Sequence, residues 1–433
     1  MTIMFERLKQ ARKDSVVRSE LKKLIQDCDR LLGEAGESIS VTLAEQALER
    51  FKKLDPASRT EFYKLLASRY DPDPAEIQKC AAAYAESHDA ADLIALINAA
   101  EPPRQELLRR LNRSPQGTAR ILEMRQEILS QLKKAPQMRA VDSDFEHLLS
   151  SWFNPGFLRL EKLDWNSPAH LLEKVIQHEA VHAIDGWADL RRRLEQDRRL
   201  FAYFHPALPG EPLIFVEVAL VPEMPAAIAP LLDRKVAPDA DSKHYKVATF
   251  YSISNCQPGL KGVHLGNFLI KRVAEQLKAE FPSLKSFCTL SPIPSLMSFI
   301  SGVQPLAHEP FSARQNMALQ ELRVSVRERL AAPGAIPIAG DLAKDVERLC
   351  AAYLMQTAPR EPGMSDPVAK FHLNNGARLE RINVSADLST KGGRQSLGLM
   401  VNYAYDLDDI ETNHEKFVAG QVIAARQVKA LLG

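Results

Sequence analysis

FYSISNCQPGLKGVHLGNFLIKRVAEQLKAEFPSLKSFCTLSPIPSLMSF, residues 250–299, carries the strongest fold signals in this sequence. The apolar run from Ala248 to Ser254 predicts one strand, and the run from Leu284 to Leu290 predicts a second. Between them, the spacing of apolar residues predicts a helix that begins near Leu265. We therefore expect a strand, a glycine-rich turn, a helix and a strand in succession.

The turn that precedes this helix contains Gly259, Gly262 and Gly266. Glycines let backbone N–H groups approach a ligand closely, and the start of a helix directs free N–H groups and a positive dipole end at an anion. The turn therefore predicts a site for a pyrophosphate. Its spacing matches neither the GxGxxG fingerprint nor the P-loop pattern, so a plain strand-to-helix turn remains the alternative.

Several blocks of the sequence carry a resemblance to one family. They are FYSIS (250–254), QPGLKGVHLGNFLIKRV (257–273), LSPIP (290–294), FHLNNGARLERINVSADLSTKGGRQSLGLMVNYAYDL (371–407), WFNPGFLRL (152–160) and GEPLIFVEVAL (210–220). In these blocks the chain resembles malonyl-CoA decarboxylases. The first 150 residues match that family only by position and helical character.

The resemblance implies an α+β chain of two domains. Residues 1–155 would form a helical domain that takes part in oligomer assembly, as a dimer or tetramer, and residues 156–433 an acetyltransferase-like (GNAT) mixed α/β domain. In that fold a sheet splays open so that an acyl-CoA lies across it, with its pyrophosphate on the turn before the central helix. The residues that map onto this turn are Lys261, Gly262, Val263, His264, Leu265, Gly266 and Asn267.

The resemblance also singles out Ser291 and His372, which match the family's catalytic pair, assigned as proton acceptor and proton donor, and which would also contact the substrate. Ser291 closes a predicted strand and precedes the rigid Pro292. A histidine can change protonation near neutral pH. Without the family, a turn-capping serine and a structural histidine are the favoured interpretations. The sequence does not say which of the two handles the enolate and which the proton.

One position departs from some relatives. His264 stands in the turn where they have a glutamate, so a scheme that needs a carboxylate there does not suit this chain. Downstream, Asn383, Asn402 and Tyr403 are candidate substrate contacts, but roles in stabilising the fold are favoured.

The segment around His372 also carries local signals. Asn375-Gly376 predicts the tight turn of a hairpin between strands at 371–374 and 379–387. Residues 396–405 predict a further strand, and residues 415–432 a closing helix.

The first third of the chain is typical of a helical bundle. Asp55 before Pro56 and Asp73 before Pro74 predict helix starts. A capping box at Thr42 predicts another. We find no fixed-period repeat, which favours a bundle over a solenoid.

Composition excludes several classes of protein. With 56 basic against 55 acidic residues, the chain has no electrostatic footprint for nucleic acid or an anionic membrane. No apolar stretch is long enough to span a membrane, no signal peptide is visible, and the chain does not end in Ser-Lys-Leu. We therefore expect a cytoplasmic protein, most simply bacterial.

The five cysteines are dispersed and form no CxxC pair, which indicates reduced thiols. Cys256 and Cys288 lie within or beside the central blocks, where one of them as a nucleophile is the alternative to burial as a small apolar residue.

Residues 178–182, His-Glu-Ala-Val-His, match the HExxH pattern of zinc hydrolases. A helix that starts at Pro168 after a capping Ser167 would place both histidines one turn apart, where they can share a metal ion. No third ligand follows at a fitting spacing. Structural histidines are favoured, and no metal is expected.

Three function classes remain. The leading one is decarboxylation of malonyl-CoA to acetyl-CoA and carbon dioxide in fatty-acid metabolism, without metal or redox cofactor, because the thioester carbonyl itself takes up the electron pair as an enolate. A GNAT-type acyltransferase would use the same CoA turn but needs an acceptor and a base. A non-catalytic helical scaffold would bind no CoA.

Overall fold

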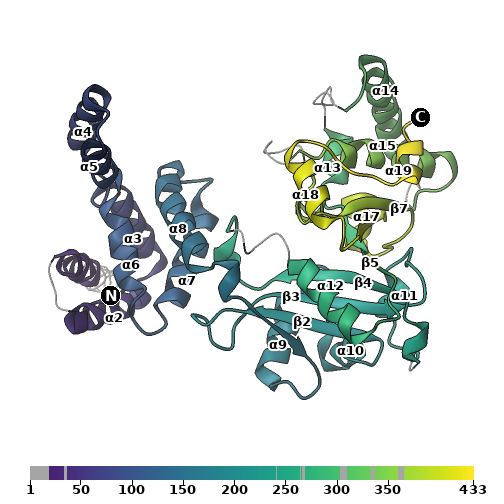
Figure 1. Ribbon diagram of the computed structural model, residues 1–433, viewed down its shortest axis with the longest axis horizontal. Helices are drawn as coiled ribbons and strands as arrows, with labels where there is room; N and C mark the ends of the chain where they lie inside the picture. Colours follow the sequence, from purple (N-terminus) through teal and green to yellow (C-terminus); the bar gives the residue numbers. More distant parts are fainter. Residues whose placement is uncertain are drawn as a thin grey trace, which may run out of the picture. The chain divides into compact units, whose positions relative to one another are not determined.

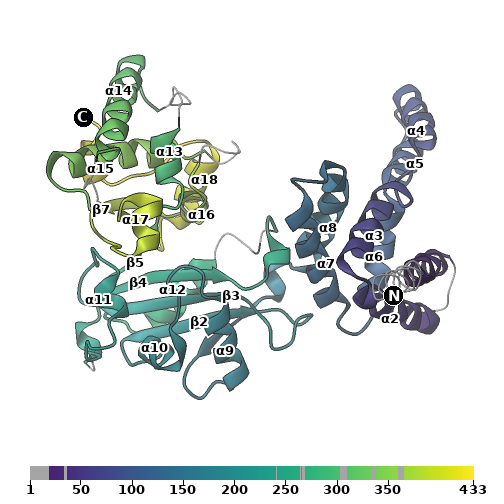
Figure 2. The ribbon, with the colours of Figure 1, turned by 180° about the vertical axis from the view of Figure 1, so that it is seen from behind.

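The computed structural model describes residues 19–33, 37–239, 241–263, 265, 269–302, 310–332, 337–358 and 365–433. The chain divides into two compact units, which Figures 1 and 2 show from opposite sides. The first comprises residues 1–158 together with segments 205–211 and 257–265. The second comprises residues 159–204, 212–256 and 266–433. A helical part followed by a mixed α/β part confirms the predicted fold class.

Helices build the first unit. Residues 19–32 are helical. The elements that follow are α2 (Glu37–Lys53), α3 (Pro56–Ser68), α4 (Pro74–Ser87), α5 (Ala90–Ala100), α6 (Pro103–Leu111), α7 (Gly117–Gln131), α8 (Arg139–Trp152) and the short 3-10 turns η1 (Pro136–Met138), η2 (Pro155–Phe157) and η4 (Pro258–Leu260). The side chains of Asp55 and Asp73 accept hydrogen bonds from the first turns of α3 and α4, which confirms both predicted starts. The predicted start at Thr42 is wrong, because α2 begins at Glu37 and runs through it.

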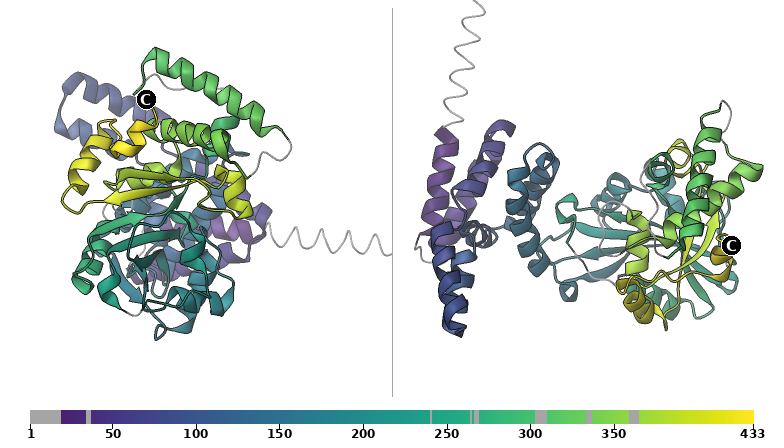
Figure 3. Two further views of the ribbon diagram at one scale, coloured as in Figure 1. Left: turned by 90° about the vertical axis from the view of Figure 1, so that its right-hand side faces the viewer. Right: turned by 90° about the horizontal axis from the view of Figure 1, so that it is seen from above.

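Helices α4 and α5 pair as a hairpin, which is seen from two further sides in Figure 3. Neither helix contains a buried residue. On α5, Leu93 is 37% exposed and Ile94 and Ile97 are each 58% exposed. The hairpin therefore presents an apolar face that the rest of the described chain does not cover.

One mixed sheet organises the second unit. Its strands are β1 (Arg159–Leu163), β2 (Arg198–Phe204), β3 (Pro212–Val221), β4 (Val247–Asn255), β5 (Ser286–Thr289), β6 (Ser291–Pro292), β7 (Arg378–Asn383) and β8 (Met400–Tyr405). The order is β1-β2-β3-β4-β5-β8-β6, and β7 also pairs with β8. The strands β4 and β5 confirm the two predicted apolar runs.

The sheet separates between β4 and β5, which are parallel neighbours. Their pairing ends at Phe250 and Thr289. Beyond that point β4 continues against β3 to Asn255, whereas the chain after β5 stays paired with β8 through β6. This divergence is the splay that the acetyltransferase-like fold predicts.

Helices cover both faces of the sheet. The helices of this unit are α9 (Ala169–His178), α10 (Gly186–Arg193), α11 (Ala229–Leu232), α12 (Leu269–Glu280), α13 (Leu296–Ser301), α14 (Ala313–Leu330), α15 (Gly340–Met355), α16 (Pro367–Asn374), α17 (Thr390–Ser396), α18 (Ile410–Val418) and α19 (Arg426–Ala430), with a 3-10 turn η3 (Ser242–His244). Because side chains alternate along a strand, Leu200 and Ala202 of β2 pack with α9 and α10, whereas the hydroxyl of Tyr203 reaches the carbonyl of Leu269 on α12. Among the described helices, none is long and apolar enough to cross a membrane.

The predicted hairpin at Asn375-Gly376 is wrong. Residues 367–374 form the helix α16, because Asp366 caps its first turn and Pro367 suits the first helical position. Gly376, at φ +78°, lies just past the end of this helix rather than in a two-residue hairpin.

The C-terminal expectations also need correction. Residues 390–396 form α17 before β8 begins at Met400, so the strand is shorter than predicted. The closing helix is two short helices. Between them Gly420 has φ +89°, and Leu379 of β7 hydrogen-bonds Ile423 and Ala425 through the backbone, which draws this segment alongside the strand.

Candidate active site

Ser291 and His372 meet although 81 residues separate them in sequence. Ser291 lies in β6, opposite Val401 of β8. His372 lies in the last turn of α16. The Oγ of Ser291 and the Nε2 of His372 are 2.9 Å apart, and both side chains are buried. The structure therefore brings the two predicted residues into direct contact.

A chain of hydrogen bonds passes through this pair. Ser291 Oγ donates to Thr289 Oγ1 at 2.9 Å, which leaves it as the acceptor toward Nε2 of His372. On the other side of the ring, Nδ1 lies 2.8 Å from the hydroxyl of Tyr405. A neutral imidazole carries one N–H, and this network assigns it to Nε2, with Tyr405 donating to Nδ1.

The surroundings keep the imidazole neutral. The ring of Tyr403 stacks on that of His372, with centroids 4.7 Å apart and planes 27° apart. Burial lowers the pKa of His372 to about 3, and burial raises the pKa of Tyr405 well above its usual range. At neutral pH the ring therefore presents a neutral Nε2–H, and Tyr405 keeps its proton.

Sequence reasoning did not identify Tyr405 or Thr289. The period of two along a strand places Tyr403 with Tyr405, and Thr289 with Ser291, on common faces. That signal shows which residues share a face of a strand. It does not show that their faces meet His372, because the pairing of β5 and β6 with β8 is a tertiary contact.

We expect the free energy of unfolding to fall as the pH drops below about 6.5. In the unfolded chain His372 takes up a proton near that pH, whereas in the folded chain it does so only near pH 3. Stability from the neutral ring is thus present above pH 6.5 and is lost as the pH falls, by about 2 kcal/mol at pH 5. Urea unfolding of the wild type and of His372→Gln at pH 8 and pH 5 measures this loss. The same pH dependence in both proteins would contradict it.

The Tyr405→Phe substitution is expected to lower kcat roughly 10- to 100-fold, as loss of an outer hydrogen bond that orients a histidine does elsewhere. It also leaves the buried Nδ1 of His372 without its donor, which costs about 1–3 kcal/mol of stability. Steady-state kinetics and thermal unfolding measure the two effects. Tyr84→Phe on α4 is the matched control and should change neither. An unchanged kcat in Tyr405→Phe would show that the hydroxyl does not orient the ring.

A cavity of about 290 Å³ adjoins the pair at the splay of the sheet. Residues of β4, β6 and α16 line it, together with Val181 and with Ile214 of β3. Its lining comprises Val181, Ile214, Phe250, Tyr251, Ser252, Ile253, Asn255, Ser291, Pro292, Pro367, Val368, Phe371 and His372. The lining is mainly apolar with a few polar groups, which is typical of a small-molecule site.

The part of the glycine-rich turn up to Leu265 belongs to the first unit. Lys261, Gly262, Val263 and Leu265 are described, whereas His264, Gly266 and Asn267 lie outside the described residues. Gly262 has φ +86°, a backbone conformation that favours glycine.

A buried arginine holds this turn, and sequence reasoning missed it. Arg125 of α7 is 1% exposed, and its Nη1 donates to the carbonyl of Gly259 at 2.9 Å. Its other nitrogens pair with Asp142 and Glu146 of α8 at 3.0 Å each. A Cβ on Gly259 would lie 2.3 Å from the carbonyl oxygen of Leu122, so only glycine fits there.

The helical interpretation of the HExxH stretch is wrong, because α9 ends at His178. Ser167 does not cap that helix either; its Oγ accepts from the N–H of Asp164. Glu179 instead accepts hydrogen bonds from the N–H groups of Val181 and His182 and from the hydroxyl of Ser252. These bonds hold the loop that follows α9 against β4. Among the described residues, no group of three His, Cys, Asp or Glu side chains is arranged to hold a metal ion.

The remaining candidates stabilise the fold. Asn402 donates to the carbonyl of Thr289 at 2.8 Å and accepts from Asn383 at 2.8 Å, which ties β8 to its neighbours. Cys256 and Cys288 are buried, and burial raises the pKa of Cys288 to about 12. Cys288 is therefore a thiol and not a nucleophilic thiolate at neutral pH.

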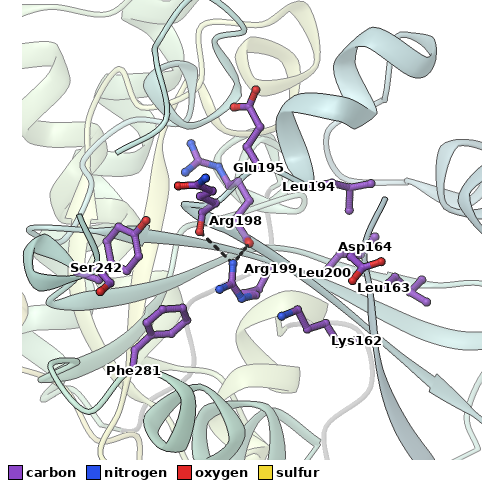
Figure 4. Close-up of a pocket in the computed structure, with 12 residues that line it drawn as sticks. Lys162, Leu163, Asp164, Leu194, Glu195, Arg198, Arg199, Leu200, Ser242 and Phe281 are labelled. Atoms are coloured by element: carbon purple, nitrogen blue, oxygen red, sulfur yellow. Dashed lines mark hydrogen bonds between the residues drawn. The ribbon is translucent and has the colours of Figure 1, made fainter. Parts of the chain in front are cut away.

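A second cavity, of about 360 Å³, lies elsewhere in the second unit and contains none of the predicted site residues (Figure 4). Arg199 and Lys162 line it, and both pair with Glu280, at 2.7 and 3.3 Å. Arg199 also donates to the carbonyls of Gln196 and Arg198 and stacks on Phe281. Because these cations are already paired, the cavity is not a candidate anion site.

Comparison with protein families gives two matches. The model described as the malonyl-CoA decarboxylase C-terminal domain matches residues 156–433, and the one described as the N-terminal domain matches residues 70–153.

Individual relatives agree with these matches. Mitochondrial malonyl-CoA decarboxylase of Anser anser anser is 34% identical, over 75% of this chain and 68% of the relative. That of Rattus norvegicus is 32% identical, over 87% of this chain and 82% of the relative. The crystal structure of malonyl-CoA decarboxylase from Rhodopseudomonas palustris has a TM-score of 0.83 at 44% identity, covering 95% of this chain and 99% of that one. The structure from Agrobacterium vitis gives 0.82 at 44% identity, covering 95% and 100%.

Proposed function

This chain belongs to the malonyl-CoA decarboxylase family, and from that premise we propose that it is a carboxy-lyase that converts malonyl-CoA to acetyl-CoA and carbon dioxide. The observation that carries the proposal is the buried contact of 2.9 Å between Ser291 and His372 beside a cavity at the splay of the sheet. An acyl thioester that enters this cavity lies beside the hydroxyl of Ser291 and the Nε2–H of His372. To donate to the thioester oxygen, the O–H of Ser291 turns away from Thr289.

The reaction breaks the bond between the α-carbon and the carboxylate. Carbon dioxide leaves, and the electron pair moves onto the thioester oxygen as an enolate. We assign the O–H of Ser291 to hold this oxygen, a contact that forms fully only as charge develops. The α-carbon then takes a proton from Nε2 of His372, while Nδ1 takes one from Tyr405. The ring thus stays neutral throughout. The resting state returns when solvent protonates Nε2 and Nδ1 gives its proton back to Tyr405.

The thioester carbonyl is its own electron sink, so we propose that no metal or redox cofactor takes part. Purified protein with malonyl-CoA and a strong chelator, without an added acceptor, should form acetyl-CoA and carbon dioxide in equal amounts. Activity that disappears with the chelator and returns with a metal ion would overturn the cofactor-free scheme. Intact malonyl-CoA in the presence of CoA binding would overturn the decarboxylase and favour the acyltransferase.

We further propose that the chain forms a homo-oligomer, a dimer or a tetramer, through its helical part. The support is the hairpin of α4 and α5, which exposes Ile94 and Ile97 and buries no residue. Exposed apolar patches mark interaction surfaces. The double substitution Ile94→Lys and Ile97→Lys is expected to lower the particle mass in light scattering. Leu388→Lys, at a site 75% exposed in the second unit, is the control and should leave the mass unchanged. A mass that neither substitution changes would contradict the proposal.

A cytoplasmic location in a bacterium completes the proposal. The five cysteines are free thiols, as in proteins of reducing compartments. The near balance of basic and acidic residues indicates neither a nucleic-acid nor a membrane partner. Cell fractionation with detection of the native chain tests the location, and recovery in the membrane pellet would contradict it.

A further inference from the structure

Asp366 is a buried carboxylate that stands between the two elements of the proposed site. It is 1% exposed. Aspartate is rarely buried to this extent without partners for its charge. In the described part of the chain its partners are three backbone N–H groups: those of Val368 and Ala369 at 2.9 and 3.1 Å, and that of Ser295 at 3.1 Å.

The two carboxylate oxygens serve different segments. Oδ1 accepts from Val368 and Ala369 and so caps the first turn of α16. Oδ2 accepts from the N–H of Ser295. Asp366 therefore joins the start of one helix to a segment that approaches from another part of the sheet.

Each of these two segments ends at one member of the catalytic pair. His372 lies in the last turn of the helix that Oδ1 caps. Ser291 lies four residues before Ser295, along a segment that Pro292 and Pro294 stiffen. A short helix and a proline-rich segment are both stiff. The hydrogen bonds of Asp366 therefore constrain the positions of Ser291 Oγ and His372 Nε2.

We propose that Asp366 is a positioning residue for the reaction, because its carboxylate bridges the two segments that carry Ser291 and His372 and thereby sets the 2.9 Å separation of their side chains. This inference rests on the proposed function for its kinetic consequence, but its geometric part stands independently of the substrate. Burial raises the pKa of Asp366, and its three N–H donors oppose that shift.

The Asp366→Asn substitution separates the two contacts. An asparagine oxygen can cap α16 as well as an aspartate oxygen does. Its amide nitrogen then faces the N–H of Ser295. Because both groups are donors, the hydrogen bond to Ser295 is lost. If the amide flips, the hydrogen bond to Ser295 forms, but the cap of α16 is lost. In either orientation one of the two segments is released, while the shape of the side chain is kept.

Asp73→Asn is the matched control, since Asp73 also precedes a proline and caps a helix, α4, with no second segment tied to its other oxygen among the described hydrogen bonds. We expect Asp366→Asn to lower kcat for malonyl-CoA at least tenfold with less than a threefold change in KM, and Asp73→Asn to change neither. Thermal unfolding of both variants reports any general loss of fold.

Crystal structures of the wild type and of Asp366→Asn supply a readout that needs no activity. The distance between Ser291 Oγ and His372 Nε2 should lengthen beyond 3.5 Å in the variant, and it should stay near 2.9 Å in Asp73→Asn. An unchanged distance with an unchanged kcat would overturn the positioning role. A wild type that does not decarboxylate malonyl-CoA would instead overturn the proposed function, and the measured distance would still decide the role of Asp366.

Discussion

The His372→Ala substitution is expected to lower kcat for malonyl-CoA by roughly a thousandfold, within the range of a positioned general acid. In the proposed scheme this ring delivers the proton to the α-carbon, and water has to replace it. A thousandfold loss corresponds to about 4 kcal/mol of barrier. The measurement is the rate of acetyl-CoA formation under saturating substrate, together with carbon dioxide release.

Two variants make this result specific. His244 is exposed and pairs with Asp239, so His244→Ala should leave kcat unchanged. The His372→Gln variant keeps a hydrogen-bonding side chain of similar size but has no ionisable ring to relay a proton from Tyr405, so it should stay close to the alanine variant. Near-full activity in His372→Gln would show that the ring acts through hydrogen bonding alone.

The Ser291→Ala substitution is expected to lower kcat on the order of a hundredfold, because one well-aimed donor to a developing oxyanion is worth about 3 kcal/mol. KM should change little, since the contact forms mainly in the transition state. Stopped assays of acetyl-CoA with varied malonyl-CoA separate the two constants. A raised KM with an unchanged kcat would instead place Ser291 in binding the ground state.

Ser298→Ala, seven residues further along the same segment and exposed, is the control for this substitution and should behave as the wild type. The double variant of Ser291 and His372 is informative as well. Because the two groups share one hydrogen bond and act on one reacting centre, its loss should be smaller than the product of the two single losses. A strictly multiplicative loss would indicate two independent roles.

The strands around the splay could be predicted because their signals are local. The runs in β4 and β5 are short, apolar and bounded by turn residues, and the helix between them has its own period. The identities of Ser291 and His372 came from a resemblance to a family. Their contact follows from the pairing of β6 with β8 and from the position of α16, which no local pattern encodes.

The error at His372 has a physical cause. An Asn-Gly pair suits a two-residue hairpin turn, but it equally suits the end of a helix, where a residue in the left-handed region is needed. The deciding signal lay upstream, in Asp366-Pro367, the same cap and first position that correctly predicted helices at Asp55-Pro56 and Asp73-Pro74.

The helix prediction for the HExxH stretch is wrong for a different reason. A helix that continued to His182 would fit the apolar stripe of α9, but Glu179 finds better partners in Ser252 and Ser254 of β4 and in the N–H groups that follow it. Those serines are over seventy residues away, so the competition between helix and loop is decided by tertiary contacts.

The contact between the glycine-rich turn and α7 limits how the two sequence domains could recombine in evolution. Gly259 lies in the segment that the C-terminal family model matches, whereas Arg125 and Leu122, which receive it, lie in the segment that the N-terminal model matches. A gene that carried only residues 156–433 would encode the turn without the arginine that holds it. The two sequence domains are therefore not interchangeable modules, and recombination at their boundary would have to preserve both sides of this contact at once.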